Sequence, residues 1–366
     1  MKGYTEERLR LLDENSRALD MAGLRVLLKP SPSEPLPGRL DHDLLAAEAA
    51  RPGFDFSAMD KLPPEERLAR IRDGMGGYNV NICTEEVHAK YEALSFNGNP
   101  VGLWRYYKRG SERRPDKPAL LWIHGGGWIG GSVYTVENAC RYIAELADAV
   151  VFSVEYSLAP EKPYPNGLYD CFAALRHIAA KAGDYGVDAG RIVIGGDSAG
   201  GNYAAIITLL AREQGGPPLA GQILLYPCVL VDEAAPEGYR WSLDEFTMDA
   251  SQRERIAWRL NLGRPVPPAS NPMHTAYLNG ADPADPFVSP GMAASHQALP
   301  PALLAAGEFD GLRIQTEFYA GLLQAAGVPL RCLRYGGVSH AFLDLIGLVP
   351  QAEDFCREAA RFIRSL

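Results

Sequence analysis

Hydrophobic and polar positions follow a regular alternation through most of the chain. From residue 119 onward, short continuous apolar runs are separated by longer segments whose apolar residues recur at helical spacing. The short runs are typical of strands covered on both faces, and the longer segments of amphipathic helices. This alternation predicts an α/β fold with parallel strands joined by right-handed crossovers. We expect strands at 119–123, 150–154, 191–194, 222–226, 302–306 and 330–335, and helices at 133–147, 167–180, 203–210, 312–326 and 351–366.

The first quarter of the chain has a different pattern. Charged and apolar residues recur at helical spacing there, interrupted by a cluster of prolines between residues 30 and 37. The pattern predicts a helix that includes residues 9–21, a proline-rich joint, a helix over 40–50 and another that starts near Pro63. Residues 1–90 are therefore expected to form an N-terminal helical arm, which either packs against the core or covers the site as a cap.

The alternation is interrupted again between residues 229 and 285, which are charged, dotted with prolines and loosely helical. Long interruptions between strands are usually functional or disordered. We interpret this segment as a cap insertion, with a plain surface insertion as the alternative. A β-hairpin around Asn97-Gly98 should begin the main sheet. The catalytic core then comprises residues 91–228 and 286–366.

The composition limits the partners and the compartment. The chain has 366 residues, of which 47% are hydrophobic, so it can bury a large core. A net charge of −9 argues against nucleic acid and anionic membranes as partners, because both need clustered Lys and Arg. No secretory signal or membrane-spanning run is visible, so we expect a cytoplasmic protein without stable membrane association. The scattered cysteines are predicted to be core residues: Cys83, Cys140, Cys171, Cys228, Cys332 and Cys356.

A glycine-delimited turn follows the strand predicted at 191–194. Gly196-Asp197-Ser198-Ala199-Gly200 has the G-x-S-x-G spacing, in which small residues allow a strand to turn sharply into a helix. Such a turn holds its serine in a strained conformation at the positive end of the helix. Ser198 is therefore the candidate nucleophile, and an ordinary turn with a solvated serine is the alternative.

A serine nucleophile needs a base and an acid that orients the base. His340 is the candidate base, because it follows the last predicted strand and completes the chain order Ser, acid, His. Asp310, after the strand at 302–306, is the preferred acid, since a short carboxylate at a loop tip can fix one imidazole tautomer. Glu308 in the same loop is the second candidate.

The glycines after the first long strand have no side chains to cover their backbone N–H groups, so these groups can donate hydrogen bonds to an oxyanion. This stretch is His124-Gly125-Gly126-Gly127-Trp128, and the amide of Ala199 would add a donor from a second loop. His124 is expected to brace the loop rather than to transfer protons.

The same glycines also fit a dinucleotide site. Residues 125–130 satisfy G-x-G-x-x-G after a strand, and Glu155 ends the next strand, where a ribose-binding acid would lie. A dinucleotide turn normally opens its domain, however, whereas this one follows a hairpin. The chain has neither an H-E-x-x-H ligand spacing nor a P-loop lysine. We therefore expect no cofactor and no metal.

Together these motifs resemble the hormone-sensitive-lipase-like α/β-hydrolases, also called bacterial family IV esterases. The resemblance extends over residues 93–366 and is carried by 124–128, 155–161, 196–202, 226–227, 289–290 and 337–342. It implies the α/β-hydrolase fold, with a mostly parallel eight-stranded sheet, helices on both faces and a helical cap. It also implies that no cofactor is bound, and it suggests a homodimer joined through the final strand and helix.

The resemblance implies a serine carboxylesterase that hydrolyses small esters of short to medium acyl chains through an acyl-enzyme. Its triad would be Ser198, Asp310 and His340, and its oxyanion amides would be those of Gly125, Gly126 and Ala199. The residues that support the site or line the substrate would be His124, Gly127, Trp128 and Asp197. Two alternatives use the same scaffold: an amidase or formamidase on the same triad, and a non-catalytic small-molecule receptor.

Overall fold

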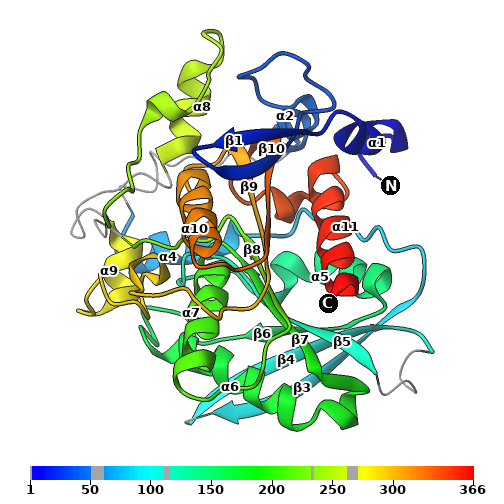
Figure 1. Cartoon of the computed structure of the whole chain (residues 1–366), viewed down its shortest axis with the longest axis vertical. Coiled ribbons are helices and arrows are strands. Elements are labelled where there is room, and N and C mark those ends of the chain that lie inside the picture. Colours follow the sequence, from blue (N-terminus) through cyan, green and yellow to red (C-terminus); the bar gives the residue numbers. More distant parts are fainter. Residues whose placement is uncertain (1, 51–61, 97, 111–115, 232–234, 262–270) are drawn as a thin grey trace.

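The computed structural model describes residues 2–50, 62–96, 98–110, 116–231, 235–261 and 271–366. These residues form a ten-stranded sheet with helices on both faces (Figure 1). The strand order is β1-β2-β10-β9-β8-β7-β5-β6-β4-β3. The strands are β1 (Arg17–Met21), β2 (Leu24–Lys29), β3 (Val87–Phe96), β4 (Asn99–Lys108), β5 (Lys117–Ile123), β6 (Val150–Glu155), β7 (Val187–Asp197), β8 (Gly221–Leu225), β9 (Ala302–Phe309) and β10 (Leu330–Ser339). The helices are α1 (Glu6–Glu14), α2 (His42–Ala49), α4 (Pro64–Asp73), α5 (Val133–Ala147), α6 (Asn166–Ala180), α7 (Ala199–Glu213), α8 (Arg253–Leu260), α9 (Pro272–Leu278), α10 (Arg313–Ala325) and α11 (Pro350–Ser365).

The central strands confirm the predicted parallel sheet. From β6 through β5, β7, β8 and β9 to β10, each strand pairs in parallel with the next one in the sheet. β5 and β8 are buried along their whole length, which explains why their sequences are continuous apolar runs. β3 and β4 form the predicted antiparallel hairpin beside β6.

The sheet separates two hydrophobic cores. Leu121 and Ile123 of β5 face one core, and Leu120 and Trp122 face the other, because successive strand side chains point to opposite faces. Helices α6, α7 and α10 complete the first core, and α5 and α11 complete the second (Figure 1). None of the six cysteines, all of which the structure describes, forms a disulfide, and five of them are buried, as expected of core residues. No described helix combines the length and apolar character that crossing a bilayer requires.

Residues 17–29 form a hairpin, which corrects the helix predicted over residues 9–21. β1 and β2 are joined by a two-residue turn at Ala22 and Gly23, whose φ angles are 53° and 91°. Positive φ at both positions matches the twist of a β-hairpin. The apolar residues of β1 also fit helical spacing, which explains the helix prediction. In β2, however, Leu24 and Val26 are buried on either side of exposed Arg25, and this is the alternation of a strand. The sheet therefore has ten strands instead of the expected eight.

The hairpin also changes the position of the final strand. β2 pairs with β10 in parallel, so β10 lies between β2 and β9. A dimer joined through the final strand needs a free backbone edge on that strand. Because β2 occupies this edge, the suggested dimer would require the hairpin to move away.

Candidate active site

Ser198 lies in the sharp turn between β7 and α7. Its φ is 54° and its ψ is −118°, a conformation that a non-glycine residue keeps only where the surrounding structure holds it. A Cβ at Gly196 would lie 2.5 Å from the Gly200 carbonyl carbon, and a Cβ at Gly200 would overlap the Ile123 carbonyl oxygen. Both glycines of the motif are therefore required by close backbone approach, and the turn places Ser198 at the carboxyl end of the sheet.

Ser198, His340 and Asp310 form a hydrogen-bonded chain. His340 Nε2 lies 2.9 Å from Ser198 Oγ, and His340 Nδ1 lies 2.9 Å from Asp310 Oδ2. The three residues directly follow β7, β10 and β9, whose carboxyl ends meet at one edge of the sheet. The structure thus brings together the three residues of the predicted triad. In this arrangement His340 can accept the proton of Ser198.

Asp310 is fully buried, and both of its carboxylate oxygens have partners. Oδ2 contacts His340, and Oδ1 accepts a hydrogen bond from the Leu312 N–H at 2.8 Å. Burial lowers the pKa of His340, but the carboxylates of Asp310, Asp197 and Asp344 together outweigh burial and raise that pKa above its ordinary value, with Asp310 contributing most among them. Asp310 therefore stabilises the imidazolium that forms when His340 accepts a proton.

Glu308, the second candidate acid, makes a different contact. Its Oε2 accepts a hydrogen bond from the Gly337 N–H at 2.9 Å. Gly337 lies where the register of β10 shifts, between Tyr335 and Ser339, just before His340. Such an irregularity leaves backbone groups without ladder partners, and Glu308 satisfies one of them. The side chain thus supports the segment that carries His340.

Two residues outside the motifs bind the same irregularity. The Asp41 N–H donates to the Gly337 carbonyl oxygen at 2.9 Å, and Gln351 Nε2 donates to the Gly336 carbonyl oxygen at 3.2 Å. Gln351 Nε2 also donates to Asp41 Oδ2 at 2.9 Å. Sequence analysis did not identify either residue, because neither lies near a motif and only the fold brings them together.

The loop after β5, residues 124–131, places bare backbone beside Ser198; we call it the oxyanion loop. A Cβ at Gly125 would lie 3.1 Å from Ser198 Cβ. Gly126 has a φ of 126°, and its carbonyl oxygen accepts hydrogen bonds from the N–H groups of Ile129 and Gly130 at 3.2 and 3.0 Å. These two bonds close the loop into a turn.

The N–H groups near Ser198 fall into two sets. The backbone of Gly125, a predicted oxyanion donor, forms a hydrogen bond with the Asp197 carboxylate that lowers the pKa of Asp197. The N–H groups of Gly126, Gly127 and Ala199 have no acceptor among the residues that the structure describes. Ala199 begins α7, where helix amides lack intrahelical partners. These contacts favour the N–H groups of Gly126, Gly127 and Ala199 as oxyanion donors, with Gly127 in place of the predicted Gly125; the donor set stays a prediction.

Asp197 lies buried between β5 and the oxyanion loop. Trp122 Nε1 donates to its Oδ1 at 3.0 Å, and the Gly125 N–H donates to the same carboxylate. Burial raises the pKa of Asp197 to about 6, although both hydrogen bonds lower it. The carboxylate also contributes to the raised pKa of His340. Asp197 thus connects the loop to the sheet and adds negative charge near the base.

His124 and Trp128 flank the three glycines. The pKa of His124 is lowered by burial, and its ring stacks on Tyr156 with centroids 4.4 Å apart. His124 Nδ1 lies 2.8 Å from the Gly125 carbonyl oxygen, which fits a neutral imidazole that donates from Nδ1. Trp128 stacks on Tyr277 at a centroid distance of 4.2 Å. His124 therefore braces the loop from within, and Trp128 connects it to α9.

The segment predicted as a cap insertion contributes α8 and α9. Tyr277 of α9 packs on Trp128, and its carbonyl oxygen accepts a hydrogen bond from the Tyr164 N–H at 2.8 Å. Ile256 and Leu260 of α8 are buried in the second core. Residues 262–270 of this segment, and 51–61 of the N-terminal arm, lie outside the described residues. The role of both segments as a cap stays a prediction.

One group of three carboxylates within the described ranges lies close enough to ligate a metal ion: Asp13, Asp354 and Glu358. Lys29 Nζ lies 2.6 Å from Asp13, 2.6 Å from Asp354 and 2.8 Å from Glu358. Lys29 is fully buried, and Arg361 binds Asp13 and Glu358 as well, so these carboxylates are already paired with cations of the chain. The group is therefore an ion-pair network that ties the N-terminal hairpin to α11.

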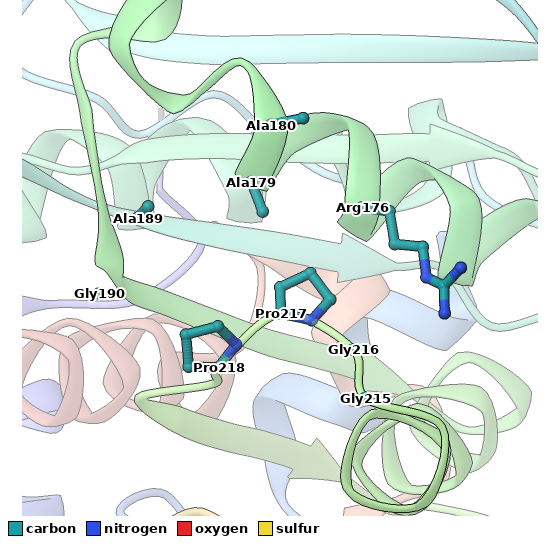
Figure 2. A pocket seen from close by; sticks show the side chains of 9 residues that line it. All are labelled: Arg176, Ala179, Ala180, Ala189, Gly190, Gly215, Gly216, Pro217 and Pro218. Atoms are coloured by element: carbon teal, nitrogen blue, oxygen red, sulfur yellow. The ribbon is translucent and has the colours of Figure 1, made fainter.

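A hollow of about 570 Å³ lies between the end of α6, the start of β7 and the turn before β8 (Figure 2). It is lined by small side chains and prolines, and Arg176 is the only charged residue among those that line it. The hollow lies at the amino ends of β7 and β8, whereas Ser198 follows the carboxyl end of β7. It is therefore separate from the candidate active site.

Comparison with known sequences agrees with this geometry. Residues 120–344 match the family described as alpha/beta hydrolase fold. The chain belongs to the α/β-hydrolase family. This hydrolase is 34% identical to esterase LipI of Mycobacterium tuberculosis over 72% of its own length and 77% of LipI. It is 37% identical to carboxylic ester hydrolase LipN of the same organism over 79% of its own length and 74% of LipN.

Solved structures of other α/β-hydrolases are similar over nearly the whole chain. An arylesterase structure matches with a TM-score of 0.70 and 26% identity, covering 89% of this hydrolase and 99% of that chain. An esterase from the archaeon Pyrobaculum calidifontis matches with a TM-score of 0.65 and 29% identity, covering 89% and 98%. The resemblance to the hormone-sensitive-lipase-like hydrolases is confirmed, and the dinucleotide-binding alternative has no support.

Proposed function

We propose that this protein is a serine carboxylesterase that hydrolyses small esters of short to medium acyl chains. The observation that carries the proposal is the chain of two 2.9 Å contacts from Ser198 Oγ through His340 to Asp310. Further support comes from the relatives, which are named esterases and carboxylic ester hydrolases.

In the proposed reaction, Ser198 Oγ attacks the ester carbonyl carbon while its proton passes to His340 Nε2. The negative charge on the carbonyl oxygen would be met by the N–H groups of Gly126, Gly127 and Ala199. His340 then returns the proton to the leaving alcohol as the bond between carbon and the alcohol oxygen breaks. This leaves an acyl group on Ser198.

Water completes the cycle by the same route. His340 takes a proton from water, the hydroxide oxygen attacks the acyl carbon, and the proton returns to Ser198 Oγ as the acid leaves. Asp310 holds the imidazole in one tautomer throughout. Its buried position keeps this ion pair away from water, which strengthens the interaction.

The esterase is favoured over the two alternatives that share the scaffold. An amidase would use the same three residues but must protonate an amine leaving group, and the relatives cited above are named for ester hydrolysis. A receptor would not need the contact between His340 and Ser198, which here has hydrogen-bonding distance.

The test is hydrolysis of nitrophenyl esters from acetyl to dodecanoyl, with the matching anilides, by the parent and by Ser198→Ala. Ser365→Ala, which changes an exposed serine on α11, is the matched control. We expect the parent and Ser365→Ala to hydrolyse the shorter esters, and Ser198→Ala to lose that activity. Ester turnover by Ser198→Ala at the parent rate would contradict the proposal, and turnover of anilides alone would favour the amidase.

A further inference from the structure

The last turn of α4 reaches the oxyanion loop from outside the sheet. Arg72 Nε donates a hydrogen bond to the Ile129 carbonyl oxygen at 2.6 Å. A Cβ at Gly130 would lie 2.7 Å from Met75 Sδ and 3.2 Å from Arg72 Cγ. The N-terminal segment is therefore in direct contact with the loop, and Gly130 leaves the space that this contact needs.

The same guanidinium binds a second segment beside the site. Arg72 Nη2 donates to the Ala159 carbonyl oxygen at 3.0 Å, and Nη1 and Nη2 bind the two carboxylate oxygens of Glu161 at 2.8 and 2.7 Å. The Ala159 N–H in turn donates to the Trp128 carbonyl oxygen at 2.9 Å. Arg72 thus joins three segments: α4, the oxyanion loop and the segment after β6.

Arginine suits this position better than lysine. A guanidinium presents its N–H donors in a rigid planar fork, whereas an ammonium is a single point of charge on a flexible stem. Arg72 uses this fork on two carbonyl oxygens and one carboxylate at once. Its hydrogen bond is also the main cause of the lowered pKa of Glu161. A lysine could bind one of these acceptors well but could not span all of them.

Two peptide groups connect Arg72 to an oxyanion donor. The Ile129 carbonyl, which Arg72 binds, belongs to the same peptide group as the Gly130 N–H, and that N–H donates to the Gly126 carbonyl oxygen. The Gly126 carbonyl in turn shares its peptide group with the Gly127 N–H. Because a trans peptide is planar, fixing the direction of its carbonyl fixes the direction of its N–H. Holding Ile129 therefore constrains where the Gly127 N–H points.

We propose that Arg72 is a positioning residue for the oxyanion hole, acting through the Ile129–Gly130 and Gly126–Gly127 peptide groups. The catalytic consequence rests on the proposed esterase function, whereas the effect on the loop does not. The N-terminal segment then helps to orient the reacting groups in addition to covering the core.

Four variants distinguish positioning of the oxyanion loop by Arg72 from a role that only attaches the N-terminal segment to the rest of the molecule. Arg72→Ala removes all hydrogen bonds of the guanidinium group. Arg72→Lys keeps the positive charge but lacks the planar set of N–H donors. Glu161→Gln weakens the ion pair but leaves both carbonyl contacts, and Arg70→Ala removes an exposed arginine from the same turn. For an acetyl ester we expect Arg72→Ala to lower kcat roughly tenfold with KM nearly unchanged, because a misplaced donor weakens transition-state binding. Arg72→Lys should recover part of the loss, and Glu161→Gln and Arg70→Ala should stay near the parent.

Backbone hydrogen exchange provides a readout that does not depend on turnover. We expect Arg72→Ala to speed exchange in peptides that cover residues 124–131, with little change around His340. Unchanged exchange in the loop would overturn the proposal, and so would an equal effect of Arg72→Ala and Glu161→Gln on exchange and kcat. If the parent hydrolyses no ester, the proposed function fails, and the exchange experiment still decides the role of Arg72.

Discussion

The sheet core and the N-terminal segment meet at the candidate active site, and they contribute different interactions there. In the core, α7 is buried continuously from Ala199 to Leu210, and apolar contacts dominate. The N-terminal segment also buries apolar side chains, such as Val26 and Leu40, in the two cores, and it adds polar contacts of its own to the rest of the molecule. Lys29 binds carboxylates of α11, Asp41 binds the segment before His340, and Arg72 binds the oxyanion loop.

The two kinds of interaction have different effects on the candidate active site. Apolar burial has no directional preference, so it stabilises the sheet without fixing where a loop group points. Hydrogen bonds are directional, and those from the N-terminal segment end on the backbone next to two functional groups. The core therefore places Ser198, Asp310 and His340 at one end of the sheet, and the polar contacts refine the orientation of the loops around them.

The largest expected effect distinguishes the two carboxylates near the end of β9. Asp310→Asn should lower kcat for a nitrophenyl ester by about 10³- to 10⁴-fold, because the amide favours the wrong imidazole tautomer. Glu308→Gln keeps an oxygen that can accept the Gly337 N–H, so its kcat should stay within about tenfold of the parent. Similar losses in both variants would contradict the assignment of Asp310 as the acid.

The next effect concerns the attachment of the N-terminal hairpin. Lys29→Ala should lower the free energy of unfolding by about 3–5 kcal/mol, because it removes the cation that the buried Asp354 carboxylate binds and leaves Glu358 with only the part-exposed Arg331 and Arg361. Lys108→Ala is the control, since its partner Glu85 is half exposed, and it should cost less than about 1 kcal/mol. Urea unfolding measures both. If the two variants are equally stable, the hairpin is not held by this network.

A smaller effect tests the hairpin turn itself. Gly23 has open space around it but a φ of 91°, so Gly23→Ala should destabilise the protein by about 1 kcal/mol through backbone strain. Gly321 also has open space but lies within α10, so Gly321→Ala should stabilise by about 0.5–1 kcal/mol. Thermal unfolding compares the two. A stabilising Gly23→Ala would contradict the turn between β1 and β2.

The smallest effect concerns pH. The base must be neutral to act, so kcat/KM should fall as pH drops through the raised pKa of His340. Because the Asp197 carboxylate contributes to that raised pKa, Asp197→Asn should move the acid limb to lower pH by a fraction of a unit. Asp188→Asn, at the exposed start of β7, should leave the limb in place. A shift to higher pH in Asp197→Asn would contradict the assigned charge effect.

The features that the sequence predicted correctly each carry a local signal. The central strands have continuous apolar runs, the Ser198 turn has glycines that close approach requires, and His340 and Asp310 directly follow strands. Residues 17–21 of the hairpin were wrongly predicted as helix, in part because so short an apolar pattern fits both periods, whereas the start of that predicted helix matches α1.

Other features have no signal along the chain. Asp41 and Arg72 contact segments far away in sequence, and Gln351 contacts the end of the preceding strand, through hydrogen bonds that no spacing indicates. The choice between Gly125 and Gly127 as oxyanion donors depends on the direction of individual N–H groups within a run of identical residues. Only the folded arrangement of the loop against Asp197 distinguishes them.

The most direct test of the central claim is covalent labelling with diethyl nitrophenyl phosphate, followed by mass spectrometry of the intact chain and its peptides. An activated serine displaces nitrophenolate and keeps the diethylphosphoryl group. The account predicts one such group per chain, on Ser198, with labelling slowed strongly in His340→Ala and absent in Ser198→Ala. Labelling at another residue, at the same rate in Ser198→Ala as in the parent, would contradict it.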